Sequence, residues 1–233
     1  MPLDVVGVSK VFGATRALSD VNFEVRPKSL CGLVGTNGAG KSTLLDVIGG
    51  LSEPSTGSVT VDGVATGTPA GRSLLGVVPD IPELIEGING VELLVHVGIM
   101  RGLCAASARS RATEVAGLVG VPQDSRPISI YSTGNRKRVA IAAAQMVPPT
   151  AQVLDEPLES IDPLAAERIV SSWRTYCANG GLVLLSTHDL RLASEVCDRI
   201  LVMAQGRIVE DFTDGADSDV LLDALRSHDT RRS

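Results

Sequence analysis

The chain of 233 residues lacks the basic segments that mark most nucleic-acid-binding proteins. Its longest basic cluster is Arg136-Lys137-Arg138, its formal net charge is −6, and its sequence pI is about 5.1. Phosphate contacts made by lysine and arginine supply most of the affinity for nucleic acids, so an acidic chain without a longer basic run is a poor candidate for that role. We therefore expect no nucleic-acid partner.

Cysteine is also sparse. The four cysteines, Cys31, Cys104, Cys177 and Cys197, are widely spaced and form no C-x-x-C pair, which argues against a zinc site. Cys31 and Cys197 lie in apolar runs and are typical of core thiols. Nothing in this pattern indicates an oxidising compartment.

No segment of the sequence is long and apolar enough to cross a bilayer. The longest stretch without charge, 139–154, is interrupted by Pro148-Pro149. The first residues, Met1-Pro2-Leu3-Asp4, lack the basic start and the apolar core of a signal peptide. We therefore expect a cytoplasmic protein.

The chain does contain an uninterrupted phosphate-loop motif. Residues 35–42 fit the pattern G-x-x-x-x-G-K-[ST] between a strand-like run, 30–34, and a helix-like run, 43–48. Glycines let the backbone N–H groups turn toward a phosphate, and the helix start adds its positive dipole. Lys41 is expected to reach the β- and γ-phosphates, and the Ser42 hydroxyl to hold Mg²⁺. A glycine-rich turn with a stray lysine is the simple alternative. The predicted nucleotide-binding residues here are Gly35, Asn37, Gly38, Ala39, Gly40, Lys41, Ser42 and Thr43.

A second nucleotide signature is the run Val153-Leu154-Asp155-Glu156. An apolar strand that ends in a carboxylate can hold Mg²⁺ beside a phosphate loop, and Asp155 is placed for that role. Glu156 points elsewhere, because it follows one residue later, and is a candidate general base for an attacking water. An ordinary acidic strand end is the alternative, but the phosphate loop in the same chain strengthens the metal interpretation.

Between these motifs, Tyr131-Ser132-Thr133-Gly134-Asn135 precedes a predicted helix at 136–146. Small hydroxylated residues and a glycine at a helix start can bind an anion. On their own, these residues favour the simpler interpretation of an ordinary N-cap.

The remaining pattern predicts one α/β core with an inserted helical segment. We expect strands at 3–8, 21–25, 30–34, 58–64, 74–78, 153–154, 182–185, 200–203 and 207–209. We expect further helices that begin near Asn89 and at Ser107, Pro163, Leu190 and Ser218, the last ending at Leu225. His96 and Trp173 are interpreted as structural residues within helices.

The order of these motifs resembles that of ATP-binding cassette (ABC) ATPases over nearly the whole chain. The segments that carry the resemblance are 10–13 (A-loop), 35–43 (Walker A), 132–135 (signature), 154–157 (Walker B), 160–162 (D-loop) and 186–189 (H-loop). The resemblance implies a P-loop NTPase with a RecA-like core, an N-terminal antiparallel β subdomain and a helical subdomain at about 81–147. It places the single ABC ATPase domain at 1–227 and a polar tail, expected to be disordered, at 228–233.

The resemblance also implies ATP and Mg²⁺ as cofactors and a shared catalytic site. Two such cassettes face head to tail, a homodimer being the expected form, and Ser132 and Gly134 contact the γ-phosphate bound to the other subunit. His188 contacts the γ-phosphate of its own subunit, Asp162 lies at the dimer seam, and Phe12 stacks on adenine. Phe12 packed on its own domain is the alternative for that residue.

The family couples ATP hydrolysis to movement of membrane subunits, which here must be a separate transmembrane permease. The chain is then peripheral on the inner face of the cell membrane. Thr133 and Asn135 depart from the usual signature, and the Tyr-Ser-x-Gly form at 131–134 resembles that of the subgroup serving ABC-2 type exporters. Asp80 stands where most members have glutamine, and we predict that it acts on Mg²⁺ through a bridging water, or swings in only when the membrane partner closes the helical segment onto the core.

The sequence therefore predicts an ATPase, with Glu156, His188 and Lys41 as catalytic residues and Ser42, Asp155 and Asp80 as metal ligands. Two other functions remain open. One is a cytosolic ABC ATPase that performs assembly work without transport, and the other is a nucleotide-binding regulatory module with weak hydrolysis.

Overall fold

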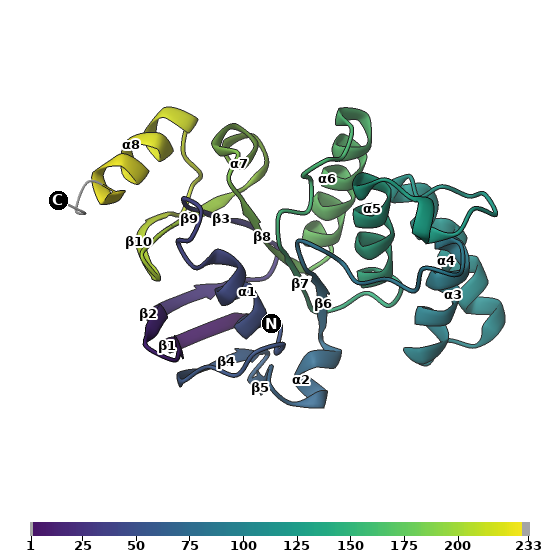
Figure 1. Ribbon diagram of the computed structural model, residues 1–233, viewed down its shortest axis with the longest axis horizontal. Coiled ribbons are helices and arrows are strands. Elements are labelled where there is room, and N and C mark those ends of the chain that lie inside the picture. Colours follow the sequence, from purple (N-terminus) through teal and green to yellow (C-terminus); the bar gives the residue numbers. More distant parts are fainter. Residues whose placement is uncertain (1, 230–233) are drawn as a thin grey trace.

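The computed structural model describes residues 2–229, which form two β-sheets and the helices around them (Figure 1). The larger sheet has, in spatial order, β10 (Arg207–Phe212), β9 (Arg199–Ala204), β3 (Leu30–Val34), β8 (Leu182–Thr187), β7 (Ala151–Leu154) and β6 (Leu75–Val78). Strands β9 to β6 are parallel, and β10 pairs antiparallel with β9. Both faces of the parallel part are covered, which explains why β3 is one continuous apolar run.

The smaller sheet is formed by the N-terminal part of the chain. Its order is β2 (Thr15–Val25), β1 (Leu3–Phe12), β4 (Thr56–Val61) and β5 (Val64–Ala65), with antiparallel neighbours throughout. This confirms the expected antiparallel N-terminal part of the fold. The loop predicted around Phe12 is shorter than expected, because β1 continues to pair with β2 up to the contact between Phe12 and Thr15.

Helix α1 (Lys41–Ile48) lies between the two sheets and is covered by both. Cys31 and Leu33 face this helix and share its core, whereas Leu30 and Val34 face the helices on the other side of the large sheet. The alternation follows from the two-residue repeat of a strand. Two apolar cores therefore enclose β3, which carries the phosphate loop at its end.

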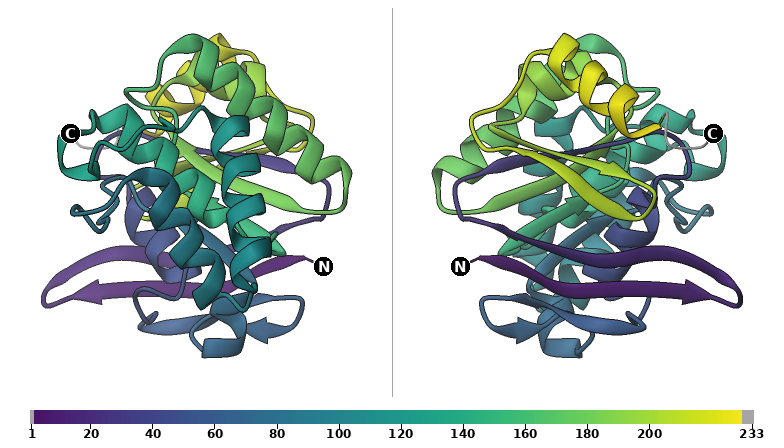
Figure 2. Two further views of the ribbon diagram at one scale, coloured as in Figure 1. Left: turned by 90° about the vertical axis from the view of Figure 1, so that its right-hand side faces the viewer. Right: turned by 90° about the vertical axis from the view of Figure 1, so that its left-hand side faces the viewer.

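The second face of the large sheet is covered by helices, and the middle of the chain projects beyond β6 as a helical layer (Figures 1 and 2). Its members are α3 (Gly90–Met100), α4 (Ala105–Val119), a short 3₁₀ helix (Ile128–Ile130) and α5 (Thr133–Ala144). The other helices are α2 (Pro69–Ser73), α6 (Pro163–Ala178), α7 (Leu190–Val196) and α8 (Ser218–Asp229).

Several predicted boundaries are wrong. Helix α5 begins at Thr133, three residues earlier than expected, because the Ser132 hydroxyl accepts a hydrogen bond from the Asn135 N–H and caps the first turn. Helix α8 continues to Asp229 instead of ending at Leu225. In its last turn, His228 Nε2 lies 3.5 Å from Glu210 Oε1. The tail therefore does not begin at 228, and residues 230–233 lie outside the described part.

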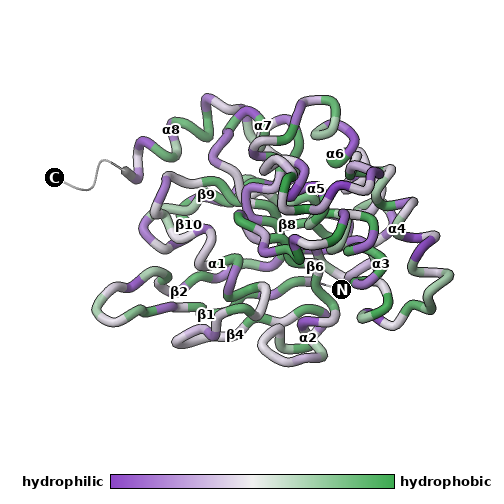
Figure 3. The backbone as a smooth tube through the Cα atoms, turned by 45° about the vertical axis from the view of Figure 1, so that its right-hand side comes forward, coloured by the Kyte–Doolittle hydropathy of each residue, from purple (hydrophilic) through white to green (hydrophobic). Residues whose placement is uncertain are grey.

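The core contains the residues that the sequence assigned to it. Trp173, Cys31 and Cys197 are buried, as expected, and burial raises the pKa of the Cys31 thiol to about 12. The inner strands of the large sheet are mostly hydrophobic, whereas the edge strand β10 carries Arg207, Glu210 and Asp211 (Figure 3). Within residues 2–229, no helix combines the length and the apolar character that a membrane span requires.

Candidate functional site

The site lies at the carboxyl edge of the parallel sheet, where four strands end side by side. Val34 at the end of β3 pairs with Thr187 of β8, and the end of β7 pairs with both β8 and β6. The segments that follow these strands carry the phosphate loop, His188, Asp155 with Glu156, and Asp80. Parallel topology thus brings together residues that are far apart in the sequence, at the edge where open α/β sheets bind ligands.

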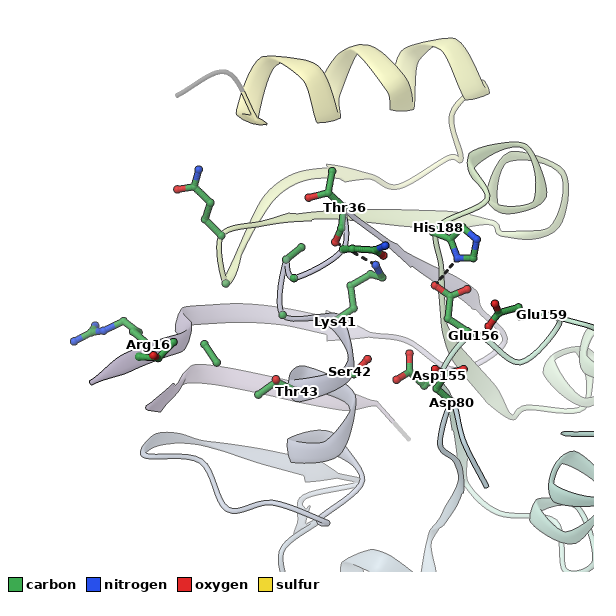
Figure 4. A pocket seen from close by; sticks show the side chains of 18 residues that line it. Arg16, Thr36, Lys41, Ser42, Thr43, Asp80, Asp155, Glu156, Glu159 and His188 are labelled. Carbon is green, nitrogen blue, oxygen red and sulfur yellow. Dashed lines mark hydrogen bonds and ion pairs between the residues drawn. The ribbon is translucent and has the colours of Figure 1, made fainter. Parts of the chain in front are cut away.

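These segments surround a cavity of about 1060 Å³ (Figure 4). One wall is the phosphate loop with the start of α1, and the opposite wall carries Asp80, Asp155, Glu156, Glu159 and His188. The outer end is formed by 15–17 of β2 and by Gln205-Gly206 of the β9–β10 turn. A volume of this size is at the upper end of the range for small-molecule sites.

The phosphate loop adopts a conformation that its glycines permit. Gly38 and Gly40 have positive φ angles of 79° and 107°, and a Cβ atom at Gly40 would approach the Ala17 carbonyl to 2.9 Å. Helix α1 begins directly after Gly40 without any side-chain cap, so no side chain takes up its first N–H groups. Lys41 is buried, and its Nζ donates to the Gly35 carbonyl at 2.8 Å. The loop therefore presents N–H groups and one ammonium to the cavity, which is what an anion requires.

Asp155 is a buried carboxylate with a fixed orientation. It accepts a hydrogen bond from the Ser186 hydroxyl, and its own N–H donates to the Val78 carbonyl at 2.8 Å. Ser42 of α1 faces it across the cavity (Figure 4). Burial, and to a lesser degree the charge of Asp155, raise the pKa of Asp46, which lies one turn after Ser42.

Glu156 and His188 form a pair on the same wall. Glu156 Oε1 lies 3.0 Å from His188 Nδ1, and the Glu156 side chain is mostly buried (Figure 4). The backbone of Glu156 has a φ of 43°, in the left-handed region that non-glycine residues rarely occupy. Such conformations persist only where the surroundings hold them, and they cluster at functional sites.

Asp80 is a half-buried carboxylate of this wall, and it is not isolated. Its Oδ1 accepts from Lys137 Nζ at 3.0 Å, and the same ammonium donates to the Glu156 carbonyl at 2.7 Å. Lys137 belongs to α5 of the helical layer. The carboxylate expected to approach a metal ion is therefore held by a lysine in this structure.

Comparison with known protein families shows to which family this chain belongs. The family model described as ABC transporter matches residues 18–159, more than half of the chain. The chain belongs to the ABC transporter family. It is an ABC ATPase, which binds and hydrolyses ATP, as its motifs predicted.

Individual relatives agree with this assignment. The chain is 31% identical over 210 residues to the linearmycin resistance ATP-binding protein LnrL of Bacillus subtilis, covering 89% of this chain and 68% of LnrL. It is 33% identical to the daunorubicin/doxorubicin resistance ATP-binding protein DrrA of Streptomyces peucetius, covering 98% and 71% of the two chains. A solved ATP-binding subunit of an ABC transporter superposes with a TM-score of 0.88 at 28% identity, covering 97% of this chain and all of that one.

The signature segment of this ABC ATPase lies outside the cavity. Ser132 is the N-cap of α5, and Gly134 sits in its first turn. A Cβ atom at Gly134 would lie 2.2 Å from the Ser160 carbonyl, so the segment packs tightly on the loop that leads to α6. The simpler interpretation of Ser132 as an N-cap therefore holds within one chain, and its predicted contact with a nucleotide requires a second chain.

Asp162 also has a structural role within the chain. Its Oδ1 accepts from the Ala165 N–H at 3.0 Å and caps α6, and Pro163 occupies the first helical position, as expected. Arg138 lies 3.8 Å from the Asp162 carboxylate and also donates to the Asn135 side chain. One arginine thus connects the signature segment to the segment predicted at the dimer seam.

Phe12, like Ser132, Gly134 and Asp162, is a predicted site residue that does not line the cavity. It lies at the end of β1, its side chain is 54% exposed, and the Lys10 ammonium sits 4.9 Å from the centre of its ring. The cavity is instead bordered on that side by Thr15, Arg16 and Ala17 of β2. The sequence assignment of Phe12 as adenine stacker stays a prediction.

Four residues of the site were not recognised from the sequence. Ser186 orients Asp155, Asp46 lies near it, Arg16 borders the cavity, and Lys137 links Asp80 to Glu156. Lys137 was counted only as part of a three-residue basic cluster. No local sequence signal identifies it, because its contacts depend on how α5 packs beside β6 and the segment that follows β7.

Proposed function

We propose that this ABC ATPase hydrolyses Mg-ATP in the described cavity and that it powers an export transporter through a separate membrane subunit. The observation that carries the catalytic part is the arrangement of Asp155 and Glu156 opposite Lys41 and Ser42 in one cavity. A carboxylate beside the metal site and a second carboxylate one residue later supply the two functions, metal binding and general-base catalysis, that hydrolysis of the phosphoanhydride bond by water requires.

The residues present fit Mg²⁺. The ion prefers oxygen ligands, and the Ser42 hydroxyl and the Asp155 carboxylate face each other across the cavity. Ser42 and Asp155 would hold it, with Asp80 as a further ligand, directly or through water. When bound, Mg²⁺ neutralises charge on the β- and γ-phosphate oxygens.

The protein's own groups have separate roles in the reaction. Lys41 and the N–H groups of 38–43 hold the phosphates, and Glu156 accepts a proton from the attacking water. His188, 3.0 Å from the Glu156 carboxylate, orients that carboxylate and contacts the γ-phosphate. The left-handed backbone of Glu156 aims its side chain away from the Asp155 carboxylate, which keeps metal binding and base function on separate groups.

Exchange of Glu156 for glutamine tests this assignment. Glu156→Gln keeps the shape of the side chain and removes its basicity, so turnover should fall by about 10²–10⁴ while ATP binding persists. Steady-state phosphate release and equilibrium binding of a fluorescent ATP analogue measure the two quantities. Near-normal turnover with intact binding would exclude Glu156 as the base.

Export is proposed because LnrL and DrrA are both named as resistance ATP-binding proteins. We infer the same arrangement here: a cytoplasmic ATPase held at the inner face of the membrane by a permease, with a second copy of the chain completing each ATP site. Ser132 and Gly134 of one copy would contact the γ-phosphate bound to the other, and Asp162 would lie at the seam. Phe12 would stack on adenine.

A further inference from the structure

Lys137 is a buried cation that contacts Asp80, Glu156 and Glu159. Only 2% of its side chain is exposed, although the residue carries a charge. Its Nζ lies 2.7 Å from the Glu156 carbonyl, 3.0 Å from Asp80 Oδ1 and 3.4 Å from Glu159 Oε2. An ammonium has three N–H donors, so each donor has one oxygen.

The partners explain why a lysine is tolerated at this depth. A buried charge is costly unless opposite charges and hydrogen bonds compensate it. Two of the three oxygens are carboxylates, Asp80 and Glu159, and both carboxylate residues line the nucleotide cavity. Lys137 itself lies behind the cavity wall, on helix α5.

The third partner is the backbone of the proposed base. The Glu156 N–H donates to Ser186 Oγ at 2.9 Å, and its carbonyl accepts from Lys137, so the left-handed residue is held from both sides. The direction of the Glu156 side chain depends on this backbone conformation. Lys137 therefore acts on the geometry of the base without itself lining the nucleotide cavity.

The charge balance of the cavity gives the same lysine a second task. Four carboxylates line the cavity, from Asp80, Asp155, Glu156 and Glu159, against the cations of Arg16 and Lys41. Carboxylates that line the cavity repel the negatively charged phosphates of a bound nucleotide. The Lys137 ammonium neutralises part of this charge from behind the wall and keeps the Asp80 carboxylate directed toward α5.

We propose that Lys137 is a positioning residue for ATP hydrolysis: it fixes Glu156 in its left-handed conformation and holds Asp80 away from the metal site, so that Asp80 reaches the metal only when it leaves Lys137. The inference rests on the proposed base and metal site. Ser132 caps α5 and Gly134 lies in its first turn. Movement of Asp80 between Lys137 and the metal therefore connects the metal site to the helix that carries the signature segment.

The first experiment separates turnover from substrate binding. Lys137→Met keeps the length of the side chain and removes its charge and donors. We expect kcat to fall at least tenfold with KM for ATP changed less than threefold. Arg136→Met is the matched control, because Arg136 is the neighbouring residue and pairs with Glu86 outside the cavity. A kcat within threefold of the parent in Lys137→Met would overturn the proposal.

The second experiment follows the metal rather than turnover. Mn²⁺ replaces Mg²⁺, a non-hydrolysable ATP analogue is present, and free Mn²⁺ is measured by electron paramagnetic resonance. Freed from Lys137, Asp80 should tighten Mn²⁺ binding severalfold in Lys137→Met, and the gain should vanish in the Lys137→Met/Asp80→Asn double variant. A merely structural lysine would give no gain that depends on Asp80, and that result would overturn the proposal.

A further variant guards against misfolding. If Lys137→Met does not fold, Lys137→Gln removes the charge but keeps a hydrogen-bond donor, and the same kcat loss and Asp80-dependent Mn²⁺ gain are expected. Turnover of Glu156→Gln tests the base assignment separately, because the Mn²⁺ comparison depends on Asp80 and not on Glu156. Absence of the Mn²⁺ gain in Lys137→Gln as well would overturn the role of Lys137 whatever Glu156 does.

Discussion

Gly134 shows at the scale of one residue how a missing side chain brings two segments together. A Cβ atom there would lie 2.2 Å from the Ser160 carbonyl, a distance at which the backbone must move. The glycine therefore allows the first turn of α5 to rest directly on the loop between Glu156 and α6. The sequence predicted Gly134 as an anion-binding residue, and its packing role is equally important for the site.

The stability of a Gly134→Ala variant measures this packing. We expect a loss of about 1–3 kcal/mol in the free energy of unfolding, the usual cost of overpacking, as determined by urea denaturation. Gly117→Ala is the control, because an added Cβ in the last turn of α4 meets nothing within 4 Å and should stabilise the helix by up to about 1 kcal/mol. Equal stability of the two variants would show that the contact with Ser160 relaxes freely.

The sequence predicted the residues whose roles depend on local order and missed those whose roles depend on the fold. The phosphate loop and Asp155 with Glu156 are recognisable because spacing along the chain fixes their chemistry. Lys137 and Ser186 contact these residues across 19 to 31 positions of sequence. No local pattern specifies which buried lysine will meet which carboxylate, because that contact is set by how α5 packs against β6, beside the segment that follows β7.

At the scale of elements, caps were predicted well and strand lengths poorly. The capping box of α3 is present as expected: Asn89 Oδ1 accepts from the Glu92 N–H at 2.9 Å, and Glu92 reaches back to the Asn89 N–H at 3.1 Å. Strand β2 begins six residues before its predicted start, because irregular pairing with β1 obscures the alternation of its side chains. Helix α2 was not predicted, although Thr68 followed by Pro69 is a helix start.

The capping box of α3 gives a prediction at this scale. Asn89→Ala removes the acceptor for the Glu92 N–H at the start of α3. It should lower the free energy of unfolding by about 1 kcal/mol. Asn89→Asp keeps an acceptor and should stay within about 0.5 kcal/mol of the parent protein. Thermal unfolding measures both changes. Because Asn89 lies outside the nucleotide cavity, ATP turnover of the isolated protein should not change, and a loss of turnover in Asn89→Ala would contradict the separation of α3 from catalysis.

At the scale of the whole molecule, the segment after Asp80 connects the nucleotide cavity to the helical layer and leaves apolar side chains exposed. Ile81 is 81% exposed and Ile85 57% exposed, and the exposed carboxylates Glu83 and Glu86 lie beside them. An acidic and apolar surface suits a basic amphipathic helix, the type of element expected from a membrane subunit. A solvated acidic loop is the competing explanation.

Charge reversal distinguishes these explanations. Glu83→Lys/Glu86→Lys should reduce co-purification of the ATPase with its permease at least tenfold while basal ATP turnover stays within twofold. Glu86 also pairs with Arg136 at 3.1 Å, so thermal unfolding must be compared alongside. Asp219→Lys/Asp223→Lys on α8 is the control with the same charge change on another helix. Unchanged co-purification of the first variant would leave the solvated loop as the explanation.

Ser132 and Gly134 lie outside the cavity that holds Lys41 and Glu156. If these residues act on the nucleotide of a second copy, two inactive variants should complement each other. Lys41→Ala removes the phosphate contact, and Ser132→Arg blocks the surface that faces the partner. In a mixed dimer, one of the two sites pairs an intact phosphate loop with an intact signature segment, so part of the turnover should return when the variants are mixed.

Light scattering supplies the control: Glu156→Gln with Mg-ATP should double in mass, and Glu156→Gln/Ser132→Arg should not. A Glu156→Gln protein that stays monomeric at saturating Mg-ATP would contradict the shared site.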